Sequence, residues 1–236
     1  MLWSSLYIVI TFFAVGAIAL AILNMNEDID KAKGRWIKYL FYLIIVAGTI
    51  WCIYKGYMQN LAIGLLFIGT YEICKGWRSS KRGGVFLGVS IIFFLVLSFF
   101  FYGFSVKMSS VFILYVYMIV FTFDGFAQLT GQLFGKRKIL PNISPNKTIA
   151  GVIGGTVMGS ATGIYMTRWL EISGNAIWVS PLVICASAFV GDILASWYKR
   201  MCLIKDYSKL IPEHGGILDR YDSFIFAGIV FGLLYS

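Results

Sequence analysis

The chain has 236 residues, of which 59% are hydrophobic and 13% are charged, and its formal net charge is +9. A mean hydropathy of +0.80 excludes an ordinary soluble domain and predicts a polytopic membrane protein. Because no soluble basic domain accompanies the positive charge, we expect no nucleic-acid partner.

Eight apolar segments along the chain are long enough, or nearly so, to cross a membrane. A bilayer-spanning helix needs about 20 mostly apolar residues, and its backbone groups must be satisfied internally. The expected fold is therefore an all-α polytopic integral membrane protein with about eight transmembrane helices. The helices are expected at about 3–23, 36–54, 57–74, 84–104, 109–128, 149–170, 176–196 and 218–236.

The distribution of lysine and arginine predicts an orientation. Seventeen of the twenty basic residues lie in the connections after the first, third, fifth and seventh segments or within three residues of them. The other connections, counted in the same way, hold only Lys55, Lys107 and Arg168. Because cytoplasmic loops are enriched in Lys and Arg, this asymmetry predicts that both termini are non-cytoplasmic. The basic connections would then face anionic lipid headgroups on the cytoplasmic side of the bilayer.

The residues suggestive of chemistry are concentrated in the second half of the chain. Residues 1–104 form the first four segments and contain a single candidate intramembrane acid, Glu72. Residues 105–236 form the last four segments, with cytoplasmic loops expected at 135–148 and 197–217. We interpret the chain as one integral domain in two parts, of which the second carries the chemistry.

The sixth segment has a regular stripe of small residues. Gly151, Gly155, Gly159 and Gly163 recur at every fourth position and so lie along one face of a helix. Such a face lets a neighbouring helix approach closely. The stripe therefore predicts close helix packing.

Two acids in the second half, Asp124 and Asp192, are expected at membrane depth. A charged carboxylate there costs about 2.5–3.5 kcal/mol on insertion scales, so it usually faces a site or a partner. A structural ion pair inside the bundle is the alternative interpretation. Asp192 is followed at i+4, i+7 and i+8 by Ser196, Lys199 and Arg200, which would share its helix face. A metal ion on Asp192 could then meet phosphates neutralised by the two cations.

The final segment is expected to begin with acids. A helix starting at Ser223 would be about 21 Å long, whereas one starting at Leu218 reaches about 28 Å, close to the membrane core of about 30 Å. Asp219 and Asp222 would then lie in its first turns. They are interpreted either as a complement to the helix dipole or as a second carboxylate pair that shares Mg²⁺ with Asp192.

A glycine turn precedes this helix. His214, the only histidine, is followed by Gly215 and Gly216, which permit close approach of the backbone to a ligand. His214 is interpreted either as a hydrogen-bonding loop residue or as a general base.

The connection at 135–148 is basic and then rich in turn residues. Ser144, Lys147 and Thr148 come directly before the sixth segment, where a helix N-terminus could help to cradle phosphate. A surface turn is the alternative interpretation. The glycine spacing in this region excludes a P-loop.

Together these residues resemble the phosphatidate cytidylyltransferase (CDP-diacylglycerol synthase) family. The family signature is similar to a set of charged and glycine residues in the last polar run: Lys199-Arg200, Lys205-Asp206, His214-Gly215-Gly216, Asp219-Arg220 and Asp222. Asp124, the Asp192–Ser196 pair and the turn at 144–148 also resemble family elements. The sequence departs from the family pattern at Ala195, Asn146, Ala150 and Glu213.

The resemblance implies an enzyme that makes CDP-diacylglycerol from CTP and phosphatidic acid and releases pyrophosphate. It implies Mg²⁺ as a cofactor, with a second, monovalent cation such as K⁺ as a further candidate. It also implies a homodimer, which we expect in the bacterial inner membrane with its site facing the cytoplasm.

The same resemblance suggests roles for individual residues. The predicted metal ligands are Asp192 and Asp219, supported by Asp124 and Asp222. The predicted catalytic residues are Lys199, Arg200, Lys205, Asp206, His214 and Arg220. The predicted substrate-binding residues are Ser144, Lys147, Thr148, Ser196, Gly215 and Gly216.

Two other functions fit part of the pattern. A CTP-dependent lipid kinase would use the same phosphate-handling residues but would leave CDP. A cation-coupled transporter would use the intramembrane acids, but it needs a polar path through both halves of the membrane. The polar groups of this chain are expected on one side only.

Overall fold

Each of the eight apolar segments forms one long helix in the computed structural model, which describes residues 2–25, 28–170, 176–208, 210–211 and 215–235. Apart from Pro181 in α7, the described helices contain no proline, so their hydrogen-bond ladders run uninterrupted. The helices are α1 (Leu2–Asn24), α2 (Ile29–Tyr54), α3 (Met58–Arg78), α4 (Gly84–Lys107), α5 (Ser110–Phe134), α6 (Ile149–Met166), α7 (Ala176–Met201) and α8 (Leu218–Tyr235). A short 3₁₀ helix, η1 (Thr167–Trp169), follows α6.

Several helices continue past the apolar segments that predicted them. α2 begins at Ile29, α5 continues to Phe134 and α7 to Met201. Hydropathy detects only the apolar part of each helix. A helix can continue past that part because many polar and basic residues also favour the helical conformation in water. The predicted loop at 197–217 therefore starts later, and Lys199 and Arg200 belong to α7.

Six of the eight helices are long and apolar enough to cross a membrane: α1, α2, α4, α5, α6 and α7. The protein is therefore an integral membrane protein by the length and composition of its helices. α3 and α8 are less apolar because charged residues lie within them, among them Glu72 in α3 and Asp219 and Asp222 in α8. That these two helices also cross the membrane stays a prediction.

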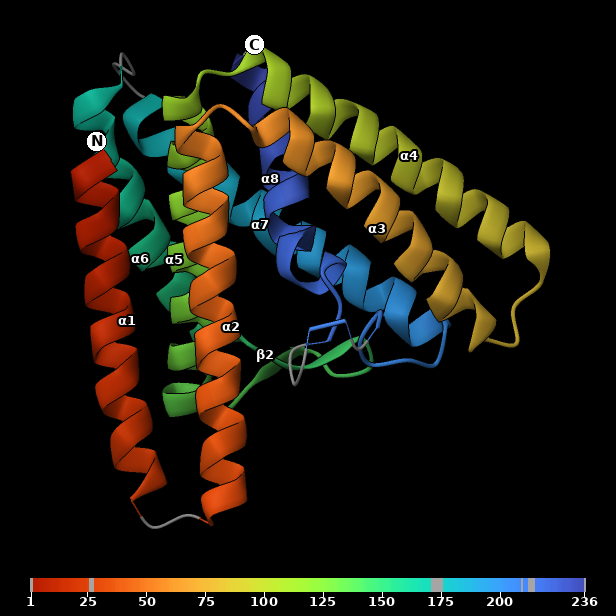
Figure 1. The fold of residues 1–236 in the computed structure, drawn as a ribbon, viewed down its shortest axis with the longest axis horizontal. Coiled ribbons are helices and arrows are strands. Elements are labelled where there is room, and N and C mark those ends of the chain that lie inside the picture. Colours follow the sequence, from red (N-terminus) through yellow and green to blue (C-terminus); the bar gives the residue numbers. More distant parts are fainter. Residues whose placement is uncertain (1, 26–27, 171–175, 209, 212–214, 236) are drawn as a thin grey trace.

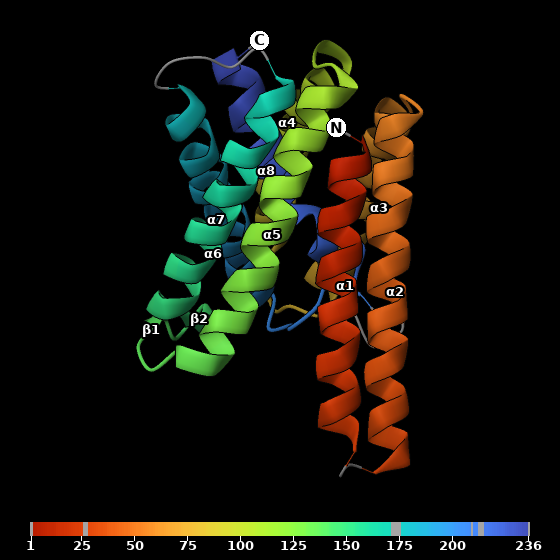
Figure 2. The same cartoon turned by 90° about the vertical axis from the view of Figure 1, so that its left-hand side faces the viewer.

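The helices are arranged as antiparallel neighbours. Figure 1 shows α1 and α2 as one hairpin and α3 and α4 as a second, tilted one. In the turned view, α5 stands between the α1–α2 hairpin and the α6–α7 layer (Figure 2). The start of α1 and the end of α8 lie at the same end of the bundle, and the end of α1 and the start of α2 lie at the other end (Figure 1). Which end meets the cytoplasm stays a prediction.

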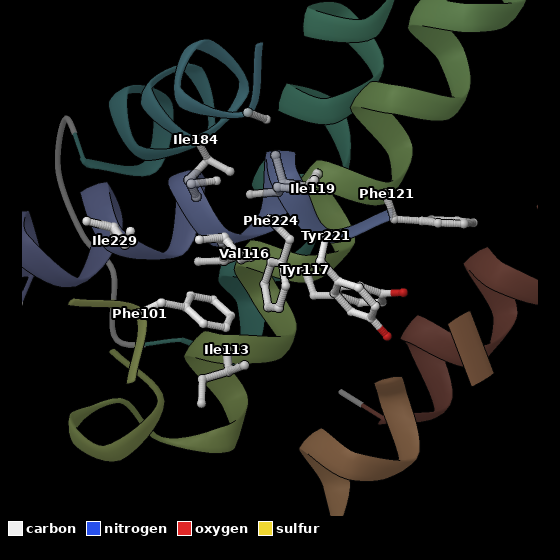
Figure 3. Packing of buried hydrophobic residues seen from close by; sticks show 14 of the residues in the cluster. Phe101, Ile113, Val116, Tyr117, Ile119, Phe121, Ile184, Tyr221, Phe224 and Ile229 are labelled. Atoms are coloured by element: carbon white, nitrogen blue, oxygen red, sulfur yellow. The ribbon is translucent and has the colours of Figure 1, made fainter. Parts of the chain in front are cut away.

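α5 is the central helix of the fold. All its residues from Ile113 to Phe123 are buried, as expected for a helix surrounded by others. Figure 3 shows Val116 and Tyr117 of α5 beside Tyr221 and Phe224 of α8. The rings of Tyr117 and Phe224 meet edge to face, with 5.1 Å between their centroids. This contact anchors α8 against the centre of the bundle.

The glycine stripe of α6 packs as closely as the sequence predicted. A Cβ atom at Gly155 would lie 2.7 Å from the carbonyl oxygen of Phe123 in α5. At Gly159 it would lie 2.7 Å from Sγ of Cys185 in α7. The stripe therefore lets α6 approach both neighbours at once.

The basic connection between α5 and α6 forms a β-hairpin that the sequence did not predict. β1 (Lys138–Leu140) and β2 (Ser144–Thr148) are antiparallel, with Lys138 opposite Thr148 and Leu140 opposite Ser144. Thr148 then caps α6, because its side-chain oxygen accepts a hydrogen bond from the Gly151 N–H at 3.1 Å. The last residue of β2 is thus also the N-cap of α6, so the hairpin leads directly into this helix.

Candidate active site

A buried ion pair joins the end of α7 to the start of α8. Nζ of Lys199 lies 2.6 Å from Oδ1 of Asp219, and the two side chains are 11% and 3% exposed. The other carboxylate oxygen, Oδ2, accepts hydrogen bonds from the N–H groups of Tyr207 at 3.0 Å and Gly216 at 2.9 Å. Asp219 therefore binds both Lys199 and the backbone of the connection between the two helices.

A second ion pair joins the hairpin to α7. Nζ of Lys147 in β2 lies 2.9 Å from Oδ2 of Asp192 and 4.7 Å from the centre of the Phe189 ring. Apart from this carboxylate oxygen, the buried Nζ atom has no hydrogen-bond partner among the described residues. Because an ammonium carries three N–H donors, the remaining ones are available to an acceptor that enters the site.

Asp192 is the more accessible of the two paired carboxylates. Its side chain is 36% exposed, and its Oδ1 accepts a hydrogen bond from the Ser196 hydroxyl one turn later at 3.3 Å. α7 continues through all four residues of the predicted face, Asp192, Ser196, Lys199 and Arg200. Lys199 lies close enough to Asp192 for their charges to interact.

The other two predicted acids lie at the same place. Asp124 of α5 is close enough to Asp192 and Asp222 to be affected by their charges, and it interacts with the side chain of Ser223. Asp222 in turn lies close enough to Asp192 and Lys199 to interact with their charges. Four carboxyl groups and two ammonium groups therefore lie within electrostatic range of their neighbours between α5, α7, α8 and β2.

The donor chemistry of this cluster fits Mg²⁺ held largely by substrate. No group of three or more His, Cys, Asp or Glu among the described residues could hold a metal ion by itself. However, Mg²⁺ at phosphate-handling sites is commonly bound by one or two carboxylates, with water and phosphates as the remaining ligands. Asp192 suits this mode because its side chain is 36% exposed, whereas that of Asp219 is 3% exposed.

Arg200 lies beside the cluster and contacts the backbone. Its Nε donates to the carbonyl oxygen of Ile143 at 3.0 Å, and its Nη1 donates to that of Ile204 at 3.1 Å. The guanidinium therefore connects the β-hairpin to the turn after α7. This contact holds the hairpin, and with it Lys147, over the end of α7.

The remaining predicted residues surround the cluster. Lys205 and Asp206 are exposed after α7, Arg220 is exposed at the start of α8, and Ser144 is half-buried in β2. Gly215 has a φ of +86°, which only glycine adopts readily, and a Cβ there would lie 3.1 Å from Oδ2 of Asp219. His214 lies outside the described residues, so its role as a general base stays a prediction.

Two residues of the site were not predicted from the sequence. Tyr207 donates its N–H to Asp219, and its ring centre lies 5.2 Å from Nζ of Lys199. Burial, together with the nearby charges of Asp222 and Asp219, raises the pKa of the Tyr207 phenol well above its ordinary value, so the ring stays neutral. Glu72 of α3, fully buried, contacts the first turn of α8. The one feature of the sequence that could have indicated a role for Glu72 is that it is the only candidate intramembrane acid in the first four segments.

The arrangement is that of a membrane protein whose helices gather lysines and carboxylates at one place, a combination suited to binding phosphate groups and a cation. The sequence model of the cytidylyltransferase family matches residues 1–236. The chain therefore belongs to the cytidylyltransferase family.

Relatives from three staphylococci bear the name phosphatidate cytidylyltransferase. The chain is 44% identical to the Staphylococcus haemolyticus protein over 118 residues, 49% of this chain and 45% of that protein. It is 30% identical to one from Staphylococcus epidermidis over 215 residues, 90% of this chain and 74% of the relative. It is 34% identical to one from Staphylococcus aureus over 172 residues, 72% of this chain and 65% of the relative. The match to the first of these spans less than half of that relative's length.

Proposed function

We propose that this protein transfers CMP from CTP to phosphatidic acid, giving CDP-diacylglycerol and pyrophosphate. Membership of the cytidylyltransferase family and the name shared by the relatives support this reaction. The structural observation that carries it is the pair of lysines, Lys147 and Lys199, each held beside a carboxylate at the same site. Cations in a partly closed site are what a reaction between two phosphate compounds requires.

The reaction needs little covalent help from the protein. An oxygen of the phosphatidic acid phosphate attacks the α-phosphorus of CTP, and the bond from this phosphorus to the oxygen leading to the β-phosphorus breaks. Pyrophosphate leaves with the electron pair of that bond. Because the attacking phosphate is already anionic at neutral pH, no side chain has to remove a proton from it. Positioning and charge neutralisation are therefore the main tasks of the site.

The two lysines divide these tasks according to their surroundings. The buried ammonium of Lys147 has the Asp192 carboxylate as its one acceptor among the described residues, so phosphate oxygens of CTP would complete its hydrogen bonding. Lys199 is held by Asp219 between α7 and α8 and supplies a fixed positive charge deeper in the site. Their carboxylate partners keep both ammonium groups in place before substrate arrives.

Magnesium would be held by Asp192 together with the phosphates of the nucleotide, and it would neutralise part of their charge. Asp124 and Asp222 place two further carboxyl groups near this position. The proposal places the reaction at the cytoplasmic face of a bacterial inner membrane, where CTP is soluble and phosphatidic acid is anchored in lipid. The homodimer and the monovalent cation stay predictions.

The products distinguish this function from its alternatives. Purified protein in detergent micelles, given radiolabelled CTP, phosphatidic acid and Mg²⁺, should yield labelled CDP-diacylglycerol and equimolar pyrophosphate. A lipid kinase would release CDP instead, and a transporter in vesicles would move its substrate without consuming nucleotide. Either of these results would replace the proposal.

A further inference from the structure

Glu72 is a buried carboxylate outside the lysine cluster. It belongs to α3, in the half of the chain with few polar residues at membrane depth, and its residue is 0% exposed. A carboxylate without water requires hydrogen-bond donors around it. Three donors are present: the Ser208 hydroxyl at 2.5 Å and the Ile217 N–H at 3.0 Å to Oε1, and the Leu218 N–H at 2.8 Å to Oε2.

These donors lie directly before Asp219. Leu218 is the first residue of α8, so its N–H is one of those that a helix leaves without an internal partner. A carboxylate at this end also complements the helix dipole. Glu72 therefore acts as the N-terminal cap of α8, although it comes from a helix about 145 residues earlier in the chain.

The fit between α3 and this segment is tight. A Cβ atom at Gly216 would lie 2.5 Å from Oε1 of Glu72, so only glycine lets the backbone approach the carboxylate this closely. Beside Glu72, the carbonyl oxygen of Ile73 accepts a hydrogen bond from the Tyr198 hydroxyl of α7 at 2.8 Å. Adjacent residues of α3 thus contact the helix that carries Lys199 and the helix that carries Asp219.

We propose that Glu72 is a positioning residue of the site: it holds the first turn of α8 against α3 and thereby keeps Asp219 opposite Lys199. Its consequence for turnover rests on the proposed function, whereas its effect on the α8 N-terminus does not. The proposal gives the first four helices a direct part in the geometry of the site.

The test compares Glu72→Gln with the wild type by hydrogen–deuterium exchange and by kinetics. An amide keeps one acceptor oxygen but presents an N–H group to the Leu218 N–H, so the cap is broken at nearly constant volume. We expect exchange of the amides at 215–218 to quicken at least about tenfold. We expect kcat per folded, monodisperse molecule to fall about 10- to 100-fold. The KM for CTP should change by less than about threefold.

Asp28→Asn is the matched control, since it makes the same chemical change at an exposed position before α2. It should leave both measurements at the wild-type level. Ser208→Ala removes a single donor to Glu72 and serves as the milder variant if Glu72→Gln does not fold. It should raise exchange at 215–218 and lower kcat in the same direction.

Three results would overturn the proposal: unchanged exchange at 215–218, faster exchange with unchanged kcat per folded molecule, or an equal effect of Asp28→Asn. If the wild-type protein shows no transferase activity, the proposed function fails. The exchange measurement then still decides whether Glu72 fastens α8.

Discussion

Lys199 of α7 and Asp219 of α8 form an ion pair that is nearly closed to solvent, with 2.6 Å between Nζ and Oδ1. Asp219 also accepts hydrogen bonds from two backbone N–H groups of the connection between the helices. The pair therefore positions this connection as well as the Lys199 ammonium. Breaking such a pair leaves one buried charge without its partner.

Replacing Lys199 by Met should therefore reduce both stability and turnover. The free energy of unfolding in detergent should fall by about 3–5 kcal/mol because the Asp219 carboxylate is left buried and unpaired. Turnover should fall at least about 100-fold through the lost phosphate-neutralising charge. Chemical unfolding followed by circular dichroism, and CDP-diacylglycerol formation, measure the two effects.

The double variant Lys199→Met with Asp219→Asn separates these effects. It removes the Asp219 charge together with its lysine partner, and the Asn oxygen can still accept hydrogen bonds from Tyr207 and Gly216. Most of the lost stability should return while turnover stays low. A single Lys199→Met variant as stable as the wild type would contradict the structural role assigned to the pair.

Lys147→Met should act mainly on nucleotide binding. Its ammonium has three N–H donors and a single acceptor, Asp192, among the described residues, so we expect it to bind phosphate oxygens when CTP enters. Loss of a charge-assisted hydrogen bond should raise the KM for CTP about 10- to 100-fold. Lys138→Met, at an exposed position of the same hairpin, is the control and should leave the KM unchanged. Equal effects of the two variants would show that only the general positive charge of the hairpin matters.

Removal of divalent cations should stop turnover, and addition of Mg²⁺ should restore it. Asp192→Asn should raise the Mg²⁺ concentration for half-maximal activity about tenfold or more, because it alters the accessible carboxylate of the cluster. Asp28→Asn should leave this concentration unchanged. Turnover in excess EDTA, or a wild-type Mg²⁺ requirement in Asp192→Asn, would rule out the role proposed for Asp192.

Gly155→Ala should destabilise the protein without touching the site. Its Cβ would lie 2.7 Å from the Phe123 carbonyl oxygen, so α5 and α6 must move apart, at a cost of about 1–3 kcal/mol. Gly88→Ala is the matched control in α4, where an added Cβ meets nothing within 4 Å. It should be neutral or slightly stabilising, because Ala favours a helix over Gly. Identical thermal midpoints for both variants would contradict the packing described for α6.

The sequence predicted the helices well because each apolar segment is bounded by charged or turn residues. α4, α6, α7 and α8 begin at the residues expected for them. The ends were less accurate: α7 continues through Lys199 and Arg200 to Met201. Hydropathy cannot detect this extension, since basic side chains past the apolar segment are compatible with both a helix and a loop.

The nearness of Asp219 and Asp222 to Asp192 was predicted from helix spacing and the shortness of the last segment, whereas Asp124 was placed with them by the family resemblance. The partners of individual side chains could not be predicted. The pairing of Lys147 with Asp192 depends on a β-hairpin whose strands carry no alternating apolar pattern, and Glu72 reaches α8 through the tilt of α3. Both contacts join residues far apart in the chain, so local sequence patterns do not contain them.

The most direct test of the central claim is product analysis with purified protein, CTP labelled in the α-phosphate, phosphatidic acid and Mg²⁺. The label should enter a lipid product, CDP-diacylglycerol, with one pyrophosphate released for each molecule formed. Lys199→Met should lower the yield of both products together, by at least about 100-fold. Consumption of CTP that leaves the label in free CDP, or no CTP-dependent product from correctly folded protein, would contradict this claim.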